Sequence, residues 1–185
     1  MDTLDALDRS FASTRTVVAE IRPEHLSLPT PCSEWDVNAV LSHTIGAIDA
    51  FRVAAAKLPS AGLPTPDVSD DPLGAYDKAT SATLAAWREP GALDGETTLA
   101  IGVAVPAQVA AGINYADCLV HGWDLRRALG IDPELDPELA EQALAISSAV
   151  VTPDIRGAGA FGPEVSVAAD ASPTARLVAF LGRQP

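Results

Sequence analysis

Apolar residues recur at helical spacing over most of the chain. From Thr3 to Ile21 they fall on one face of a helix, and Pro23 ends the run. A second run reaches Lys57, and either Ser33 or Asp36 is suited to cap its start. Both patterns predict amphipathic helices with one face turned to a core.

Proline and glycine divide the middle of the chain. The segment Pro59–Pro72 has several prolines and no periodicity, so it predicts a loop. Helical spacing returns over Pro72–Trp87 and again over Pro106–Leu129, where Gly130 ends it. Between these two runs, Thr97–Val105 is rich in β-branched residues and predicts a short hairpin or an extended crossover.

Two shorter helices are predicted near the end of the chain, over Pro137–Val151 and Pro173–Leu181. The predicted fold is therefore all-α, an up-down four-helix bundle with a short β or extended crossover and extra C-terminal helices. We expect residues 1–130 to form the bundle. Residues 131–185 are expected to pack on it as a helical segment of the same domain.

The composition of the chain argues against some classes of binding partner. The 185 residues include 12 basic and 25 acidic side chains, which give a net charge of −13. Nucleic-acid binding depends on clustered basic residues, and an anionic membrane surface would repel this chain, so neither partner is expected.

The segment Met1–Asp5 is acidic where a signal peptide is basic, and no apolar run is long enough to span a bilayer. These features predict a cytoplasmic protein, in which Cys32 and Cys118 stay reduced.

One segment concentrates the residues that could carry chemistry. On a helix, Asp117, His121 and Asp124 stand at positions i, i+4 and i+7, so their side chains leave from one face. His43, on the second predicted helix, is expected to face the bundle interior and could supply a third ligand. Two imidazoles and one carboxylate leave coordination positions open, an arrangement that suits Zn²⁺, Ni²⁺ or Fe²⁺.

The same residues also allow interpretations without a metal. A helical pair such as Asp117 and His121 can form a simple side-chain hydrogen bond, and His43 can be a core or rim histidine. Asp124 could be a catalytic base, the acceptor for a ligating histidine, or a partner of Arg126 or Arg127 in a surface ion pair.

Three other side chains are assigned to packing. Cys118 lies about 100° around the helix from Asp117 and has no basic neighbour that would lower its pKa, so we interpret it as a small buried residue. Trp35 and Trp123 are interpreted as packing residues at the ends of the bundle. The chain has no Gly-rich phosphate loop, no Gly-x-Ser-x-Gly turn and no Cys-x-x-Cys pair.

The motifs around the histidines resemble those of a known family. Thr30–Val37 (TPCSEWDV), Leu41–His43 (LSH) and Leu119–Leu125 (LVHGWDL) look like the DinB/YfiT-like metal-binding bundles, in the branch related to the N-terminal domain of mycothiol-dependent maleylpyruvate isomerase. Phe161–Val165 and Arg176–Arg183 resemble a subgroup of that branch whose members are mostly uncharacterised.

This resemblance implies a divalent metal, usually zinc, held by a histidine of the second helix and a carboxylate-x-x-x-His pair. Position by position, these ligands fall on His43, Asp117 and His121. The isomerase has Glu where this chain has Asp117, which leaves direct ligation and ligation through water both open. It also has a separate C-terminal domain, which the 55 residues after Gly130 are too few to supply.

The first hypothesis is a metal-dependent enzyme that uses a low-molecular-weight thiol, by resemblance mycothiol, as a transferase or isomerase of a small-molecule substrate. The first alternative is a metal-dependent hydrolase, in which Asp124 or Asp117 is the base. The second alternative is a bundle without catalysis that binds a ligand or partner. An acidic surface with an apolar composition is compatible with a homodimer.

Overall fold

The structure of the chain, a computed structural model, describes residues 1–157 and 161–185. Over these residues it contains seven α-helices, one 3₁₀ helix and one two-stranded sheet, which confirms the all-α prediction. The chain divides into two compact units, Met1–Ile131 and Asp132–Pro185. The prediction that the second unit packs on the first within one domain stays a prediction.

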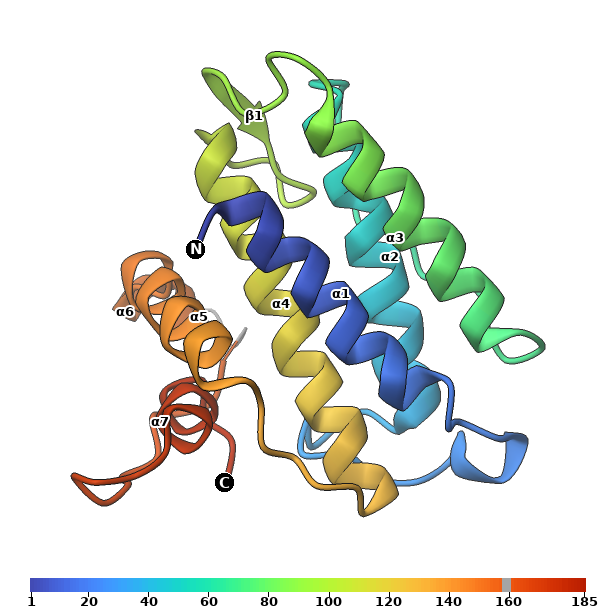
Figure 1. The fold of residues 1–185 in the computed structure, drawn as a ribbon, viewed down its shortest axis with the longest axis vertical. Coiled ribbons are helices and arrows are strands. Elements are labelled where there is room, and N and C mark those ends of the chain that lie inside the picture. Colours follow the sequence, from blue (N-terminus) through green and yellow to red (C-terminus); the bar gives the residue numbers. More distant parts are fainter. Residues whose placement is uncertain (158–160) are drawn as a thin grey trace. The chain divides into compact units, whose positions relative to one another are not determined.

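Four helices of the first unit lie side by side (Figure 1). Each corresponds to a run of helical spacing, although the first ends three residues before the predicted end, and the 3₁₀ helix η1 (Pro23–His25) follows it. The four bundle helices are α1 (Thr3–Val18), α2 (Val37–Ala55), α3 (Pro72–Arg88) and α4 (Ala107–Leu129).

Side-chain caps explain where the bundle helices begin. The Asp36 carboxylate accepts a hydrogen bond of 2.8 Å from the N–H of Ala39, so Asp36 rather than Ser33 caps α2. Asp71 caps α3 in the same way, with a bond of 2.9 Å from Gly74. Gly130 ends α4 with a φ of 68°, a conformation that costs glycine little.

The predicted crossover between α3 and α4 is a hairpin. Strand β1 (Glu96–Thr98) pairs antiparallel with β2 (Ala104–Pro106), and Thr97 stands opposite Val105. The Thr97 hydroxyl donates a hydrogen bond of 2.5 Å to the carbonyl of Ala54. This bond ties the hairpin to the last turn of α2, near the end of the bundle where α4 begins.

Helices α1 and α4 approach each other closely. Ser10 donates to the carbonyl of Tyr115 at 3.0 Å, and Thr14 donates to that of Cys118 at 3.1 Å. A Cβ added to Gly122 would overlap the Thr14 side chain, so the glycine is needed for this approach. The close contact lies beside His121 and therefore fixes the part of α4 that carries it.

The segment predicted as a loop between α2 and α3 runs along α2. The Ser42 hydroxyl donates to the carbonyl of Pro66 at 2.7 Å. One turn further along the helix, a Cβ on Gly46 would overlap the carbonyl oxygen of Pro64. The loop therefore lies directly on the backbone of α2, one residue to one turn away from His43.

The second unit contains two of the predicted helices and one that the pattern did not predict. The predicted ones are α5 (Pro137–Val150) and α7 (Pro173–Phe180), capped by Asp136 and Ser172. Helix α6 (Pro153–Gly157) has five residues, too few for a periodic pattern.

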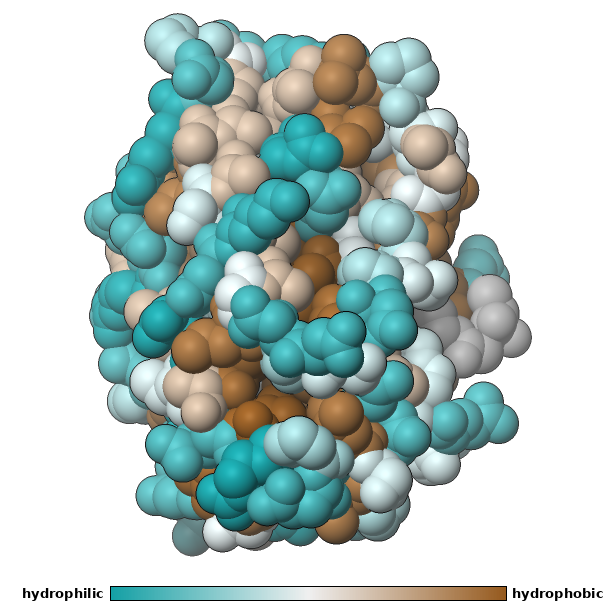
Figure 2. Space-filling view, turned by 90° about the vertical axis from the view of Figure 1, so that its right-hand side faces the viewer, coloured by the Kyte–Doolittle hydropathy of each residue, from teal (hydrophilic) through white to brown (hydrophobic). Residues whose placement is uncertain are grey.

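The face shown in Figure 2, the right-hand side of Figure 1, mixes hydrophilic residues with several hydrophobic areas. In the described parts of the chain, every helix is too short or too polar to cross a membrane.

Candidate functional site

The three predicted metal ligands meet between α2 and α4. The Nε2 atom of His43 lies 3.8 Å from Oδ1 of Asp117, and Nε2 of His121 lies 3.6 Å from the same oxygen. One candidate ligand atom from each residue lies within 4.8 Å of the others. His43 is thus brought close to two residues that lie 74 and 78 positions further along the sequence, and their role as metal ligands stays a prediction.

Helical geometry accounts for the convergence. Asp117 and His121 are one turn apart on α4 and leave from the same face. Helix α2 lies alongside and presents His43 to that face. The side chain of His121 is only 8% exposed, whereas those of His43 and Asp117 are 22% and 26% exposed. A ligand could therefore reach the site past His43 and Asp117.

Asp124 is fully buried and contacts His121 from the other side of the ring. Its Oδ2 lies 3.0 Å from Nδ1 of His121. An imidazole that donates from Nδ1 carries its lone pair on Nε2, the atom that faces Asp117. Among the three interpretations of Asp124, this geometry favours the acceptor for a ligating histidine, because a surface ion pair requires an exposed carboxylate.

The two arginines that follow Asp124 have other partners. A guanidinium nitrogen of Arg126 donates to the carbonyl of Ser13 at 3.0 Å and to the hydroxyl of Thr16 at 2.7 Å. The guanidinium of Arg127 lies 5.5 Å from the centre of the Trp123 ring. Arg126 therefore joins α4 to α1, whereas the Arg127 contact stays within α4.

The sequence did not predict that Trp35 lies against the histidines of the site. Its ring centroid lies 4.6 Å from that of His43 and 6.0 Å from that of His121. The contact joins a loop to two helices, so no periodic spacing reveals it. The available signal is its position directly before the cap Asp36, from which a long side chain can reach two turns along α2.

Cys118 is a buried packing residue, as predicted. Its Sγ lies 3.2 Å from the hydroxyl oxygen of Tyr76, and the residue has no exposed surface. Burial raises the pKa of the Cys118 thiol to about 11. The thiol is therefore protonated at neutral pH and is not a nucleophile.

The donor set fits a divalent metal ion. Imidazole nitrogen and carboxylate oxygen are the usual ligands of catalytic zinc, with bonds of about 2.0–2.2 Å. Tetrahedral bonds of that length separate two ligand atoms by roughly 3.3–3.6 Å. The 3.6 Å and 3.8 Å separations at Asp117 are close to this range, whereas the set as a whole spans up to 4.8 Å, so the histidine side chains would move toward each other on binding a metal.

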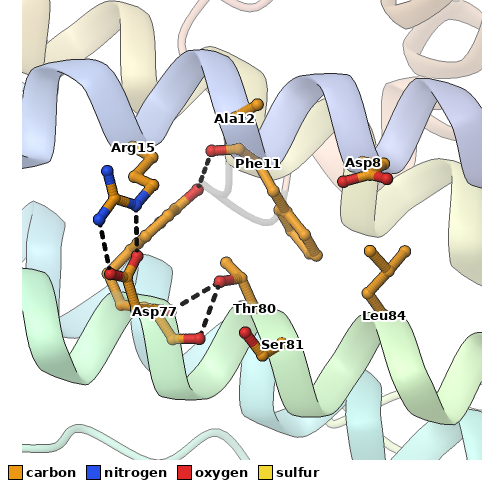
Figure 3. A pocket seen from close by; sticks show the side chains of 9 residues that line it. Asp8, Phe11, Ala12, Arg15, Asp77, Thr80, Ser81 and Leu84 are labelled. Atoms are coloured by element: carbon orange, nitrogen blue, oxygen red, sulfur yellow. Dashed lines mark hydrogen bonds and ion pairs between the residues drawn. The ribbon is translucent and has the colours of Figure 1, made fainter.

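A separate hollow lies on another helix pair, between α1 and α3 (Figure 3). Its volume is about 390 Å³, and the bidentate ion pair between Arg15 and Asp77 closes one end, with N···O distances of 2.7 and 2.8 Å. None of the predicted ligands lines it. The lining residues are Asp8, Phe11, Ala12, Arg15, Tyr76, Asp77, Thr80, Ser81 and Leu84.

Sequence comparison places the bundle in a known family. The family model described as the mycothiol maleylpyruvate isomerase N-terminal domain matches residues 7–126, which include all three candidate ligands. Two relatives from Mycobacterium tuberculosis are each 35% identical to this chain. They are the uncharacterized protein MT0763 of strain CDC 1551 and the uncharacterized protein Rv0738 of strain H37Rv. Each alignment covers 99% of this chain and 98% of the relative.

Two solved structures share the fold. Both are crystal structures of the mycothiol-dependent maleylpyruvate isomerase, one of them of a mutant, with TM-scores of 0.51 and 0.54 and identities of 14% and 13%. The matches cover 66% of this chain and 59% of the isomerase, so the chain matches less than two thirds of that enzyme's length. On the family match and the shared fold, the chain belongs to the family of the mycothiol maleylpyruvate isomerase N-terminal domain.

Proposed function

We propose that the chain is a divalent-metal-binding enzyme that transfers or isomerises a small molecule with the help of a low-molecular-weight thiol, mycothiol being the family's example. The observation that carries the proposal is the meeting of His43, Asp117 and His121. Zinc is the first candidate metal because it accepts imidazole and carboxylate ligands, and nickel and iron are alternatives.

Asp117 is proposed as a direct ligand. Aspartate is one methylene shorter than the glutamate of the isomerase, yet its Oδ1 lies within 3.8 Å of Nε2 in both histidines. That spacing needs no bridging water. The family's carboxylate position is thereby filled by a shorter side chain without a loss of reach.

The protein's own residues would prepare the site in two ways. His43 and His121 present their Nε2 atoms to Oδ1 of Asp117, and Asp124 fixes the His121 ring by accepting a hydrogen bond from Nδ1–H. We therefore assign Asp124 as a positioning residue that acts through His121. Its complete burial and its bond to the far side of the ring favour this role over that of a catalytic base.

When bound, a divalent ion supplies positive charge that favours the ionised form of a thiol at neutral pH. The partial exposure of His43 and Asp117 leaves a side from which thiol and substrate could approach. Trp35 lies against the His43 ring, and the segment between α2 and α3 bonds to the neighbouring Ser42. Three protein ligands leave coordination positions open, as catalytic sites require.

Thiol binding tests the proposal. The protein loaded with zinc is titrated with mycothiol by isothermal calorimetry, next to the His121→Ala variant. Saturable binding to the wild type and its loss in the variant are expected, since the thiol would bind through the metal. Equal binding to both proteins would contradict the proposal.

An activity screen separates the alternatives. Reactions of activated double bonds and of substrates with good leaving groups are followed with and without the thiol. The proposal expects turnover only with the thiol. Hydrolysis of acyl or amide substrates without any thiol would point to a hydrolase, and thiol binding without any turnover would point to a binding protein.

A further inference from the structure

The two histidines of the site are held by different means. The His121 ring is almost completely buried. Its orientation is fixed by Asp124, whose Oδ2 lies 3.0 Å from Nδ1. Within the described residues, no protein group makes a hydrogen bond to Nδ1 of His43. The orientation of this second ring must therefore come from packing.

Trp35 provides that packing. The centroids of the Trp35 and His43 rings are 4.6 Å apart with the planes inclined at 45°, which places the two rings in direct contact. The indole also reaches to 6.0 Å from the His121 ring, while the two imidazoles are 4.8 Å apart and edge-on. The three rings thus form one cluster.

The loop that carries Trp35 is held rigidly. The N–H of Trp35 donates to the carbonyl of Cys32 at 2.7 Å, and the carbonyl of Trp35 accepts from the Thr30 hydroxyl at 2.8 Å. The Thr30 hydroxyl oxygen also accepts from the N–H of Cys32 at 3.2 Å. Pro29 pairs with Asp36 across the base of the loop, and Asp36 caps the helix that carries His43. Loop and helix are therefore connected parts of one arrangement.

We propose that Trp35 is a positioning residue of the metal site that acts through His43. Its indole holds the His43 imidazole in the orientation in which Nε2 faces Asp117 and His121. Trp35 does for His43 what the Asp124 carboxylate does for His121. This inference rests on the proposed function, because it assumes that His43 binds a metal.

Cobalt titration tests the inference without any enzyme assay. Co²⁺ reports its ligand geometry through visible absorption, so affinity and geometry are measured together for the wild type, Trp35→Phe and Trp35→Leu. The leucine variant keeps apolar bulk without a ring and is expected to bind Co²⁺ roughly tenfold more weakly, with an altered spectrum. The phenylalanine variant keeps an aromatic face and should stay within roughly threefold of the wild type, with the same spectrum.

A matched variant controls for the general loss of an indole. Trp87 is a buried tryptophan of α3 whose Nε1 donates to Asn114. Trp87→Phe is expected to leave the cobalt affinity and spectrum unchanged. Thermal unfolding of each variant without metal shows that it is folded.

A second variant keeps the test decisive if Trp35→Leu does not fold. Thr30→Val retains every ring but removes the hydroxyl that joins Trp35 to Cys32. A loosened loop is expected to weaken Co²⁺ binding and to broaden the spectrum, by less than the leucine change. Wild-type affinity and spectrum in both Trp35→Leu and Thr30→Val, or in whichever of them folds, would overturn the inference.

The outcomes also separate this inference from the proposed function. If the wild type binds no Co²⁺, the metal site itself is wrong and the role of Trp35 is wrong with it. If the wild type binds and the ring-free variant binds equally well, the metal site stands and only the role of Trp35 is overturned.

Discussion

At the scale of single residues, the candidate site is a pair of imidazoles that the protein orients from outside. Asp124 bonds to one ring, and Trp35 lies against the other. Neither side chain is a candidate ligand. The chemistry of the site therefore depends on residues that would not touch the metal.

Removal of the Asp124 carboxylate should weaken metal binding. In Asp124→Ala, Nδ1 of His121 loses its buried partner, and zinc affinity is expected to fall roughly 10- to 100-fold, the usual effect of losing such a partner. Competition with a chromophoric chelator measures the change. The control is Asp49→Ala on α2, which breaks only the exposed ion pair with Arg52 and should leave the affinity unaltered. Equal affinities in all three proteins would refute the role of Asp124.

The thiol of Cys118 should be unreactive in the folded protein. Burial raises its pKa to about 11, so almost none of it is thiolate at pH 8. Mass spectrometry after iodoacetamide treatment is expected to find Cys32 modified and Cys118 unmodified, and both modified in urea. Since the unfolded thiol ionises near its usual pKa of 9.0 and the folded one only near 11, this group should lower stability as pH rises between those values. Rapid labelling of native Cys118 would contradict the assignment.

At the scale of elements, the site depends on how closely α4 meets its neighbours. Small or hydroxylated residues line these contacts, as at Thr14 and Gly122 between α1 and α4. On the other side, the hairpin hydroxyl of Thr97 ties α2 to the segment that leads into α4. Helix spacing, rather than any loop, then sets the distance from His43 to His121.

A methyl group at Gly122 should therefore destabilise the bundle. Gly122→Ala places Cβ against the Thr14 side chain, and overpacking of this kind costs about 1–3 kcal/mol of unfolding free energy. Urea unfolding measures the loss. In the double variant with Thr14→Ala, the obstruction is gone, so the two changes together should cost less than the sum of the single changes. Strict additivity would mean that the contact is not limiting.

Sequence reasoning predicted the elements that have a local signal. Periodicity predicted the four bundle helices and both longer helices of the second unit. Gly130 correctly marked the end of α4, whereas the run before Pro23 placed the end of α1 three residues too late. Helix α6 was missed because five residues contain too few turns to show a period. The choice between Ser33 and Asp36 as cap required the structure, because both residues have a suitable side chain.

In the candidate site, too, spacing along the sequence predicts the ligands but not the residues that surround them. Asp117 and His121 are one turn apart, so the sequence alone predicts that they share a face. The register of the second helix suggested His43 as a third ligand, and the resemblance pointed to the same residue. The Trp35 contact depends on where a loop folds back over two helices, and spacing along the chain carries no information about that. The burial of Asp124 likewise follows from packing around α4 and not from its position in the motif.

At the scale of the whole molecule, a metal that binds only the folded state must stabilise it. At a free zinc concentration 100 times the dissociation constant, the stabilisation is about 2.7 kcal/mol. The thermal midpoint of the wild type should therefore rise with added zinc, and that of His43→Ala should not. Differential scanning calorimetry makes the comparison, and equal shifts in both proteins would show that zinc acts at another place.

Metal stoichiometry tests the central claim most directly. The protein is prepared without an affinity tag or chelator, reconstituted with zinc, and analysed for bound metal beside His43→Ala, Asp117→Ala and His121→Ala. The matched control is His25→Ala, because His25 lies in η1 against Arg22 and away from the candidate ligands. About one ion per chain is expected in the wild type and the control. The three ligand variants are expected to lose it. A wild type without metal after reconstitution, or ligand variants that keep it, would contradict the claim that these three residues form a metal site.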